Sequence, residues 1–164
     1  MRKRRSYETG HRPKLLVVVD ETPEADRALY YAARRVARLG AGLVMLTVIP
    51  VGETQVWLGV GDIMKAEAEE KAEALLTRAA ERARAIAAVE PERLVRDGVT
   101  SQEIAKLIEE DEDISSLILA AGIGAEGPGP LVTSLAAKGG TGFLIPVTIV
   151  PGNLDDAEID ALAG

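Results

Sequence analysis

The residues best suited to bind a phosphate group lie between positions 117 and 134, in LILAAGIGAEGPGPLVTS. The apolar run at 117–121 is too short for a helix and predicts a buried strand of a parallel sheet covered on both faces. The glycines that follow tolerate a positive φ and let backbone N–H groups approach an anion. Two hydroxyls then fall at the start of a helix expected over about 131–138, where free N–H groups and the helix dipole favour phosphate. The predicted phosphate loop comprises Gly122, Gly124, Gly127, Thr133 and Ser134, and the alternative is that the glycines serve only as turns.

A second candidate, Asp20, follows another continuous apolar run at 15–19. Thr22 as N-cap and Pro23 at the first helical position predict that a helix begins here. A further strand at 43–49 completes a βαβ unit with parallel strands. Asp20 therefore lies at the carboxyl end of the first strand, the edge where open α/β sheets bind ligands. It is either a ligand contact or an acid that favours the helix start.

The sequence provides few residues for catalysis. Its one histidine, His11, lies in a basic N-terminal segment, and the chain has no cysteine. Acid–base and nucleophilic mechanisms lack their usual groups, and thiolate metal sites are excluded. We predict no catalytic and no metal-binding residue, so the sequence favours a binding protein over an enzyme.

Composition narrows the class of protein. A chain of 164 residues suits one domain, and its 47% hydrophobic but only 3% aromatic content predicts a core of Ala, Val, Leu and Ile. A formal charge of −7 argues against a nucleic-acid partner. No apolar run approaches the ~20 residues of a membrane span, so we expect no membrane partner. The lack of cysteine fits a cytoplasmic protein.

The remaining elements position these candidates. A long charged helix is expected over 62–88 and a short strand over 93–96, and Thr100 with Glu103 predicts a capping box at the next helix. A last strand at 146–151 has proline at both ends, which predicts an edge strand. Five strands alternating with four helices indicate a doubly wound parallel sheet, an α/β fold with helices on both faces.

The ends of the chain lack the pattern of the domain at 14–151. Residues 1–13 are basic and polar, and we expect a disordered, solvated tail. Residues 152–164 are acidic and either fray or form one short helix. The exposed apolar edge at 147–150 leaves backbone groups unpaired and predicts a homodimer through the last strand.

Five segments within residues 14–151 resemble the universal stress protein family: LLVVVDETPEADRAL, LVMLTVIP, GVTSQEIAKLI, SSLILAAGIGAEG and IPVTIV. The resemblance implies an adenine-nucleotide-binding α/β fold with strand order 3-2-1-4-5 that often dimerises through its last strand. It further implies that Asp20 and Val48 hold adenosine. ATP or AMP is the implied ligand, with Mg²⁺ accompanying ATP.

The glycine motif departs from the family pattern, G-x-x-G-x9-G-[ST]. Ala121 replaces the first glycine, Gly124 matches the second, the spacer is one residue shorter, and Thr133–Ser134 replace G-[ST]. The resemblance thus implies an altered phosphate loop, in which Gly122 and Gly127 are the available substitutes.

Three functions remain open at this point. The first is an adenine-nucleotide-binding module in stress response or signalling, and the second is a dimeric, stress-related interaction protein that does not bind ATP. The third is a dinucleotide-binding protein, since residues 122–127 match G-x-G-x-x-G. This third reading is the weakest, because the dinucleotide fingerprint expects an acid roughly 20 residues later at the end of the next strand, and none is present.

Overall fold

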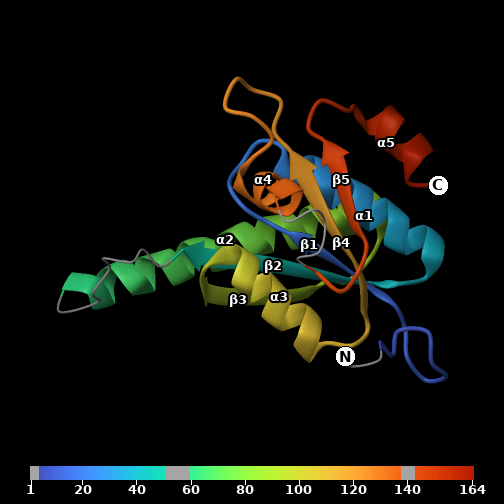
Figure 1. The fold of residues 1–164 in the computed structure, drawn as a ribbon, viewed down its shortest axis with the longest axis horizontal. Coiled ribbons are helices and arrows are strands. Elements are labelled where there is room, and N and C mark those ends of the chain that lie inside the picture. The colour runs from blue at the N-terminus through green and yellow to red at the C-terminus, as the bar shows by residue number, and fades with distance from the viewer. Residues whose placement is uncertain (1–3, 51–59, 138–142) are drawn as a thin grey trace.

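The computed structural model describes residues 4–50, 60–137 and 143–164. Within these ranges all strands are parallel and form one sheet of order β3-β2-β1-β4-β5 (Figure 1). The prediction of a five-stranded doubly wound sheet is confirmed. The elements are β1 (Lys14–Val18), α1 (Ala25–Leu39), β2 (Gly42–Pro50), α2 (Val60–Ala87), β3 (Glu92–Gly98), α3 (Thr100–Glu110), β4 (Ile114–Ala121), α4 (Pro130–Ala137), β5 (Val147–Pro151) and α5 (Asp156–Leu162).

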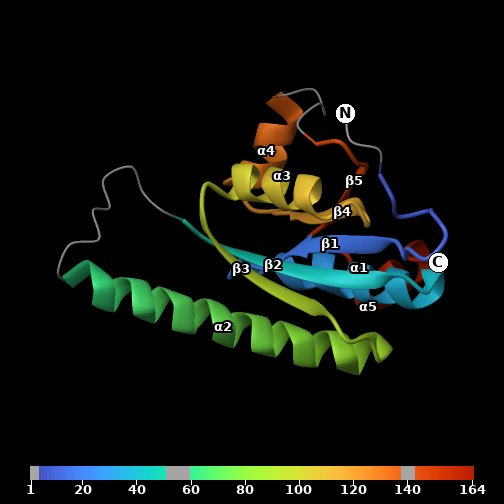
Figure 2. The same ribbon diagram turned by 90° about the horizontal axis from the view of Figure 1, so that it is seen from below.

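Both faces of the sheet are buried, which explains the continuous apolar runs. Alternate side chains of β1 enter different cores: Leu15 and Val17 pack on one face, Leu16 and Val18 on the other. Helices α1, α2 and α5 cover the first face, and α3 and α4 cover the second (Figure 2). Strand β5 lies at an edge of the sheet, as its flanking prolines predicted.

The predicted start of the first helix is wrong. Helix α1 begins at Ala25, and Glu24 occupies the N-cap without a side-chain hydrogen bond. Thr22 instead donates its backbone N–H and its hydroxyl to Oδ1 of Asp20. This local bond between a carboxylate and the backbone two residues on holds residues 20–22 in a turn, so the helix starts later than the proline suggested.

The predicted capping box at the start of α3 is also wrong. The N-cap is Val99, and no side chain caps the helix. Glu103 is buried instead, and its Cγ lies 3.2 Å from where a Cβ on Gly98 would be. Its carboxylate pairs with Lys106 at 3.0 Å. The carboxylate that was expected to cap Thr100 therefore bonds along its own helix.

Residues 4–13, here called the N-terminal arm, are ordered against the amino ends of the strands, contrary to the expectation of a disordered tail. The guanidinium of Arg4 donates to the backbone oxygens of Ile108, Asp111 and Ile114 at 2.6, 2.7 and 2.6 Å. These carbonyls lie at the end of α3 and the start of β4. One arginine therefore ties the arm to the turn between these two elements.

Further contacts extend along the arm. Arg5 pairs with Glu112 at 2.8 Å, and Nδ1 of His11 lies 2.7 Å from Asp113. Ser6 is fully buried. Arg5 and His11 of the arm thus contact acidic side chains of the domain.

The acidic C-terminal segment forms the short helix α5, one of the two alternatives expected. Ile159 is completely buried in the core beside α1. Two ion pairs flank it, Arg27 with Asp156 and Arg34 with Asp160, each at 2.9 Å. Helix α5 is therefore packed on α1 rather than frayed.

Candidate functional site

The exit of β1 is fixed against its neighbour β2. The N–H of Val19 donates to Leu46 O at 2.8 Å, and the buried hydroxyl of Thr47 donates to Val19 O at 2.8 Å. Asp20 follows directly, at the carboxyl end of β1 as predicted. The backbone just before Asp20 is thus held by two hydrogen bonds to β2.

The carboxylate of Asp20 is exposed, and only one of its two oxygens accepts hydrogen bonds from described residues. Its Oδ1 accepts from Thr22, whereas Oδ2 accepts no hydrogen bond from any residue that the structure describes. A carboxylate oxygen has two lone pairs and can accept hydrogen bonds from hydroxyl or amino donors. With respect to the described residues, Asp20 therefore presents a free acceptor at the carboxyl edge of the sheet.

A hollow of about 440 Å³ lies beside this acceptor, between the carboxyl end of β2 and helix α2. We call it the β2–α2 hollow; its described lining includes Asp20, Glu21, Val48, Lys71, Leu75 and Thr100. The structure thus brings together Asp20 and Val48, the pair that the family resemblance connects with adenosine. The volume falls in the range of small-molecule sites, about 300–1,000 Å³.

The glycine loop between β4 and α4 is closed on itself. The N–H of Gly122 donates to Pro128 O at 3.0 Å, and the N–H of Gly127 donates to Gly124 O at 3.1 Å. Gly127 and Gly129 have φ values of +89° and +107°, which other residues rarely adopt. These glycines serve turns, and the two N–H groups are directed into the loop rather than toward a ligand.

The sequence suggested that Thr133 and Ser134 lie at the start of a helix, but the structure places them further along it. Helix α4 already begins at Pro130, and the N–H of Thr133 donates to Gly129 O at 3.0 Å in the helical pattern. Ser134 lines a separate hollow of about 110 Å³, together with Ser101 from α3. The structure therefore does not bring Ser134 together with the glycine loop.

A residue that sequence reasoning missed, Glu24, lies against this loop. A Cβ built on Gly122 would lie 3.2 Å from Oε1 of Glu24 and 3.0 Å from Gly127 O. Asp20, Glu24 and Gly129 also line a common hollow of about 70 Å³, here called the loop hollow. The available signal was positional, because an acid shortly after Asp20 belongs to the loop that borders the β4–α4 loop once β1 pairs with β4.

Close packing fixes Glu24 on its other side. Gly152 follows β5 and donates its N–H to Ala121 O at 2.9 Å. A Cβ at Gly152 would lie 2.6 Å from that oxygen and 3.0 Å from the Cβ of Glu24. Such short contacts exclude any larger residue at position 152, so the stem of Glu24 lies between two glycine backbones.

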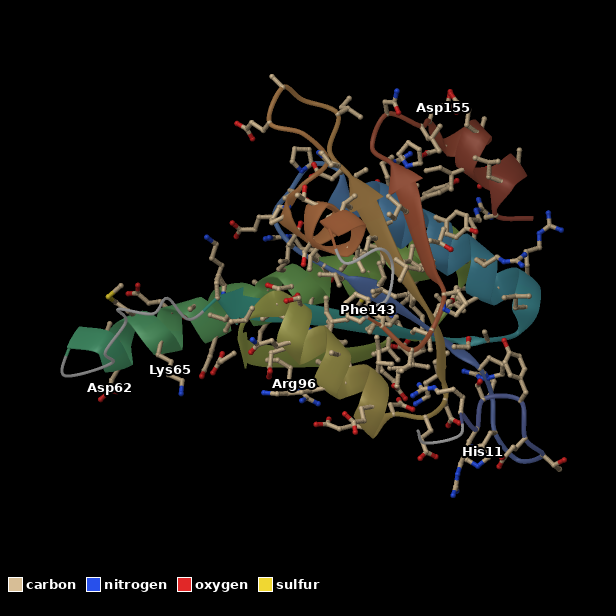
Figure 3. All side chains as sticks on the ribbon, viewed as in Figure 1. His11, Asp62, Lys65, Arg96, Phe143 and Asp155 are labelled. Atoms are coloured by element: carbon tan, nitrogen blue, oxygen red, sulfur yellow. The ribbon has the colours of Figure 1, made fainter. Side chains whose placement is uncertain are left out.

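Other chemistry is not assembled in the described part of the chain. His11 lies in the N-terminal arm, at the opposite end of the molecule from the β4–α4 loop (Figure 3). Among the described residues no three His, Asp or Glu side chains are grouped to hold a metal ion. No helix in these ranges combines the length and the apolar character needed to cross a membrane.

Comparison with known proteins identifies a family and a fold. The model of the universal stress protein family matches residues 11–151. None of the curated protein sequences compared with the chain matches it.

Several solved structures share the fold. UspA from Lactobacillus plantarum is 17% identical, with a TM-score of 0.66 and coverage of 84% of this chain and 97% of its own. A universal stress protein from Archaeoglobus fulgidus in complex with dAMP is 19% identical, with a TM-score of 0.57 and coverage of 84% and 97%. A family protein from Arabidopsis thaliana with AMP bound is 16% identical, with a TM-score of 0.59 and coverage of 89% and 99%.

Proposed function

Because the chain belongs to the universal stress protein family, we propose that it is an adenine-nucleotide-binding module acting in stress response or signalling. The observation that carries this proposal is that Asp20 and Val48 line one hollow of about 440 Å³. Solved structures of the same fold hold AMP, in the protein from Arabidopsis thaliana, and dAMP, in the protein from Archaeoglobus fulgidus, which supports a nucleotide as the ligand class.

The adenosine part of such a ligand fits the β2–α2 hollow. Val48 and Leu75 supply apolar surface for a base, and Oδ2 of Asp20 is an available acceptor for ribose hydroxyls. Burial of a planar base against aliphatic side chains is favourable because it removes apolar surface from water. The hollow thus offers the two features that a nucleoside requires.

The phosphate part fits less well. The N–H groups of Gly122, Gly127 and Thr133 donate within the protein. Mg²⁺ that accompanies a nucleotide is held by phosphate oxygens together with one or two protein carboxylates, so its contribution depends on how well the phosphates themselves are held. We therefore propose AMP or the nucleoside part of ATP as the binding determinant, with little contribution from a triphosphate held by Mg²⁺.

Calorimetry and thermal shift with AMP, ATP and NAD test the proposal. We expect AMP and ATP to bind and to raise the melting temperature, and NAD to bind no tighter than AMP. Absence of heat and of a thermal shift with every adenine nucleotide at millimolar concentration would reject the nucleotide-binding module and leave the interaction protein. A preference for NAD would support the dinucleotide alternative instead.

We further propose that the protein is a homodimer through β5. The side chain of Ile149 on this edge strand is 42% exposed, and β5 pairs only with β4 among the described strands. An unpaired apolar strand edge is a template for pairing with another chain. Light scattering should give a dimer at micromolar concentration and a monomer for Ile149→Lys, whereas the control Leu162→Lys, at an exposed position on α5, should stay dimeric. A monomeric wild-type protein would refute this proposal.

A further inference from the structure

We propose that this site selects the uncharged nucleoside over its phosphorylated forms, and that Glu24 sets this preference. The inference rests on the proposed function, because it assumes that the β2–α2 hollow holds an adenosine group. It names the ligand class more narrowly: adenosine or a similar neutral nucleoside, ahead of AMP and well ahead of ATP.

The first observation is an excess of negative charge. The β2–α2 hollow and the loop hollow share Asp20 and are together lined by three carboxylates, those of Asp20, Glu21 and Glu24, and by one cation, Lys71. Lys71 pairs with Glu21 at 3.0 Å. Asp20 and Glu24 have no cationic partner among the residues the structure describes, so within this part of the chain two negative charges are unpaired.

The second observation is where Glu24 lies. Its Oε1 is 3.2 Å from the position of a Cβ on Gly122, and its stem is held beside Gly152. A phosphate approaching the glycine loop from the hollow therefore meets this carboxylate. The stem cannot withdraw toward Gly152, because that glycine already approaches the Cβ of Glu24 closely.

The third observation is the state of the loop donors. The N–H groups of Gly122 and Gly127 form hydrogen bonds of 3.0 and 3.1 Å within the loop. An anion would have to break these bonds to use them. These two donors are thus not free to compensate a phosphate charge, as the N–H groups of a typical phosphate-binding loop do.

These observations act in the same direction. Each phosphate adds negative charge near two uncompensated carboxylates, and repulsion between like charges a few ångströms apart is stronger in a partly buried site than in bulk water. An uncharged nucleoside avoids this repulsion and can still donate a hydroxyl to Oδ2 of Asp20. Affinity should therefore fall from adenosine to AMP to ATP.

Isothermal titration with adenosine, AMP and ATP, the last with and without Mg²⁺, tests the inference. In the wild-type protein we expect adenosine to bind at least ~10-fold tighter than ATP, which corresponds to about 1.4 kcal/mol. Glu24→Gln removes the charge and keeps the shape, and should reduce the adenosine-to-ATP affinity ratio roughly 3-fold or more, as expected from one close like-charge interaction. The matched control is Glu126→Gln, because Glu126 is an exposed acid of the glycine loop between β4 and α4 that lines neither hollow; it should leave the ratio unchanged.

The possible failures are distinguishable. ATP binding as tightly as adenosine or tighter, with or without Mg²⁺, would overturn the inference and leave the proposed function intact. An unchanged ratio in Glu24→Gln, at an unchanged melting temperature, would overturn the assignment to Glu24. No binding of any adenine compound would refute the proposed function itself.

Discussion

Carboxylates at the two ends of the parallel sheet differ in their partners. At the amino ends of β1 and β3, Nζ of Lys14 lies 3.0 Å from both Glu92 and Asp111. At the carboxyl ends, Asp20 and Glu24 lie beside hollows and have no cationic partner among the described residues. Acids at the first end hold elements together, whereas acids at the second end are left available for a ligand.

The arrangement has a physical cause in the chain itself. The basic residues of the N-terminal arm precede β1 and therefore reach only the amino end of the sheet. Arg4, Arg5 and His11 all bond to residues 108–114, from the end of α3 to the start of β4. The chain has a formal charge of −7, and the carboxyl end carries part of this excess without compensation. With the proposed function, stability and binding specificity would depend on opposite ends of the strands.

Removal of residues 1–12 is the change with the largest expected effect on this comparison. Three charge-assisted hydrogen bonds from Arg4 would be lost, each worth about 1.5–3 kcal/mol, partly offset by the entropy of the freed arm. We expect a net loss of about 2–4 kcal/mol and a fall in Tm of roughly 5–10 °C. Nucleoside affinity should not change, because the arm lies at the far end of the sheet.

Thermal unfolding followed by circular dichroism measures this loss. Arg4→Met should account for most of it. The control Arg5→Met removes one ion pair of a side chain that is 57% exposed and should cost less than about 1 kcal/mol. Equal melting temperatures for the truncated and full-length proteins would show that the arm is not docked in solution.

The sequence predicted the strands well because burial on both faces leaves a local signal. The runs at 15–19, 43–49 and 117–121 had to be apolar throughout, and each overlaps an observed strand. The strand at 93–96 was predicted shorter than β3, which extends over Glu92–Gly98, because its half-exposed side chains break the apolar run.

The errors share a different cause, since they depend on contacts between distant parts of the chain. The residues to which Arg4 bonds lie more than 100 positions further along the chain, at separations of 104, 107 and 110. The composition of the arm therefore could not reveal its docking. Glu24 reaches the glycine loop only because β1 and β4 pair. The wrong prediction of Thr22 as the N-cap has a local cause. Thr22 could either cap the helix or bond to Asp20, and the turn with Asp20 is the one that forms.

Asp20→Asn should produce the next largest effect, and it acts at the other end of the sheet. Asparagine keeps the Oδ1 acceptor that holds Thr22, so the free energy of unfolding should change by less than about 0.5 kcal/mol. The charged acceptor for the ribose is lost, and adenosine affinity should fall roughly 10-fold, or about 1.4 kcal/mol. Calorimetry and urea unfolding on the same preparation separate the two quantities.

The matched variant is Asp111→Asn, which makes the same chemical change at the amino end. It removes the charge that faces Lys14 but keeps an oxygen for the N–H of Asp113, which donates to Oδ1 of Asp111. Here stability should fall by about 0.5–1 kcal/mol, with adenosine affinity unchanged. If Asp111→Asn weakened binding, or if Asp20→Asn destabilised the fold, the contrast between the two ends would be wrong.

The smallest expected effect concerns the pH dependence contributed by Lys14. Burial of this side chain tends to lower its pKa, but hydrogen bonds and charge interactions with Asp111 and Glu92 outweigh that tendency and raise the pKa above its ordinary value. A pKa raised on folding contributes stability that is fully present below the unfolded value and is lost as pH rises through the folded value. The lysine pairs should therefore stabilise the protein at neutral pH and cease to do so only in strong alkali.

Lys14→Met tests this directly by urea unfolding from neutral pH to about one unit above the ordinary lysine pKa, which is about 10.4. At neutral pH the variant should lose about 1 kcal/mol, a modest value because the lysine side chain is 23% exposed. The difference from wild type should shrink as the pH rises, since the wild-type protein loses the charge that the variant never had. A difference that stayed constant with pH would mean that the lysine stem, rather than its charge, stabilises the amino end, and the pairing with acids there would no longer explain its stability.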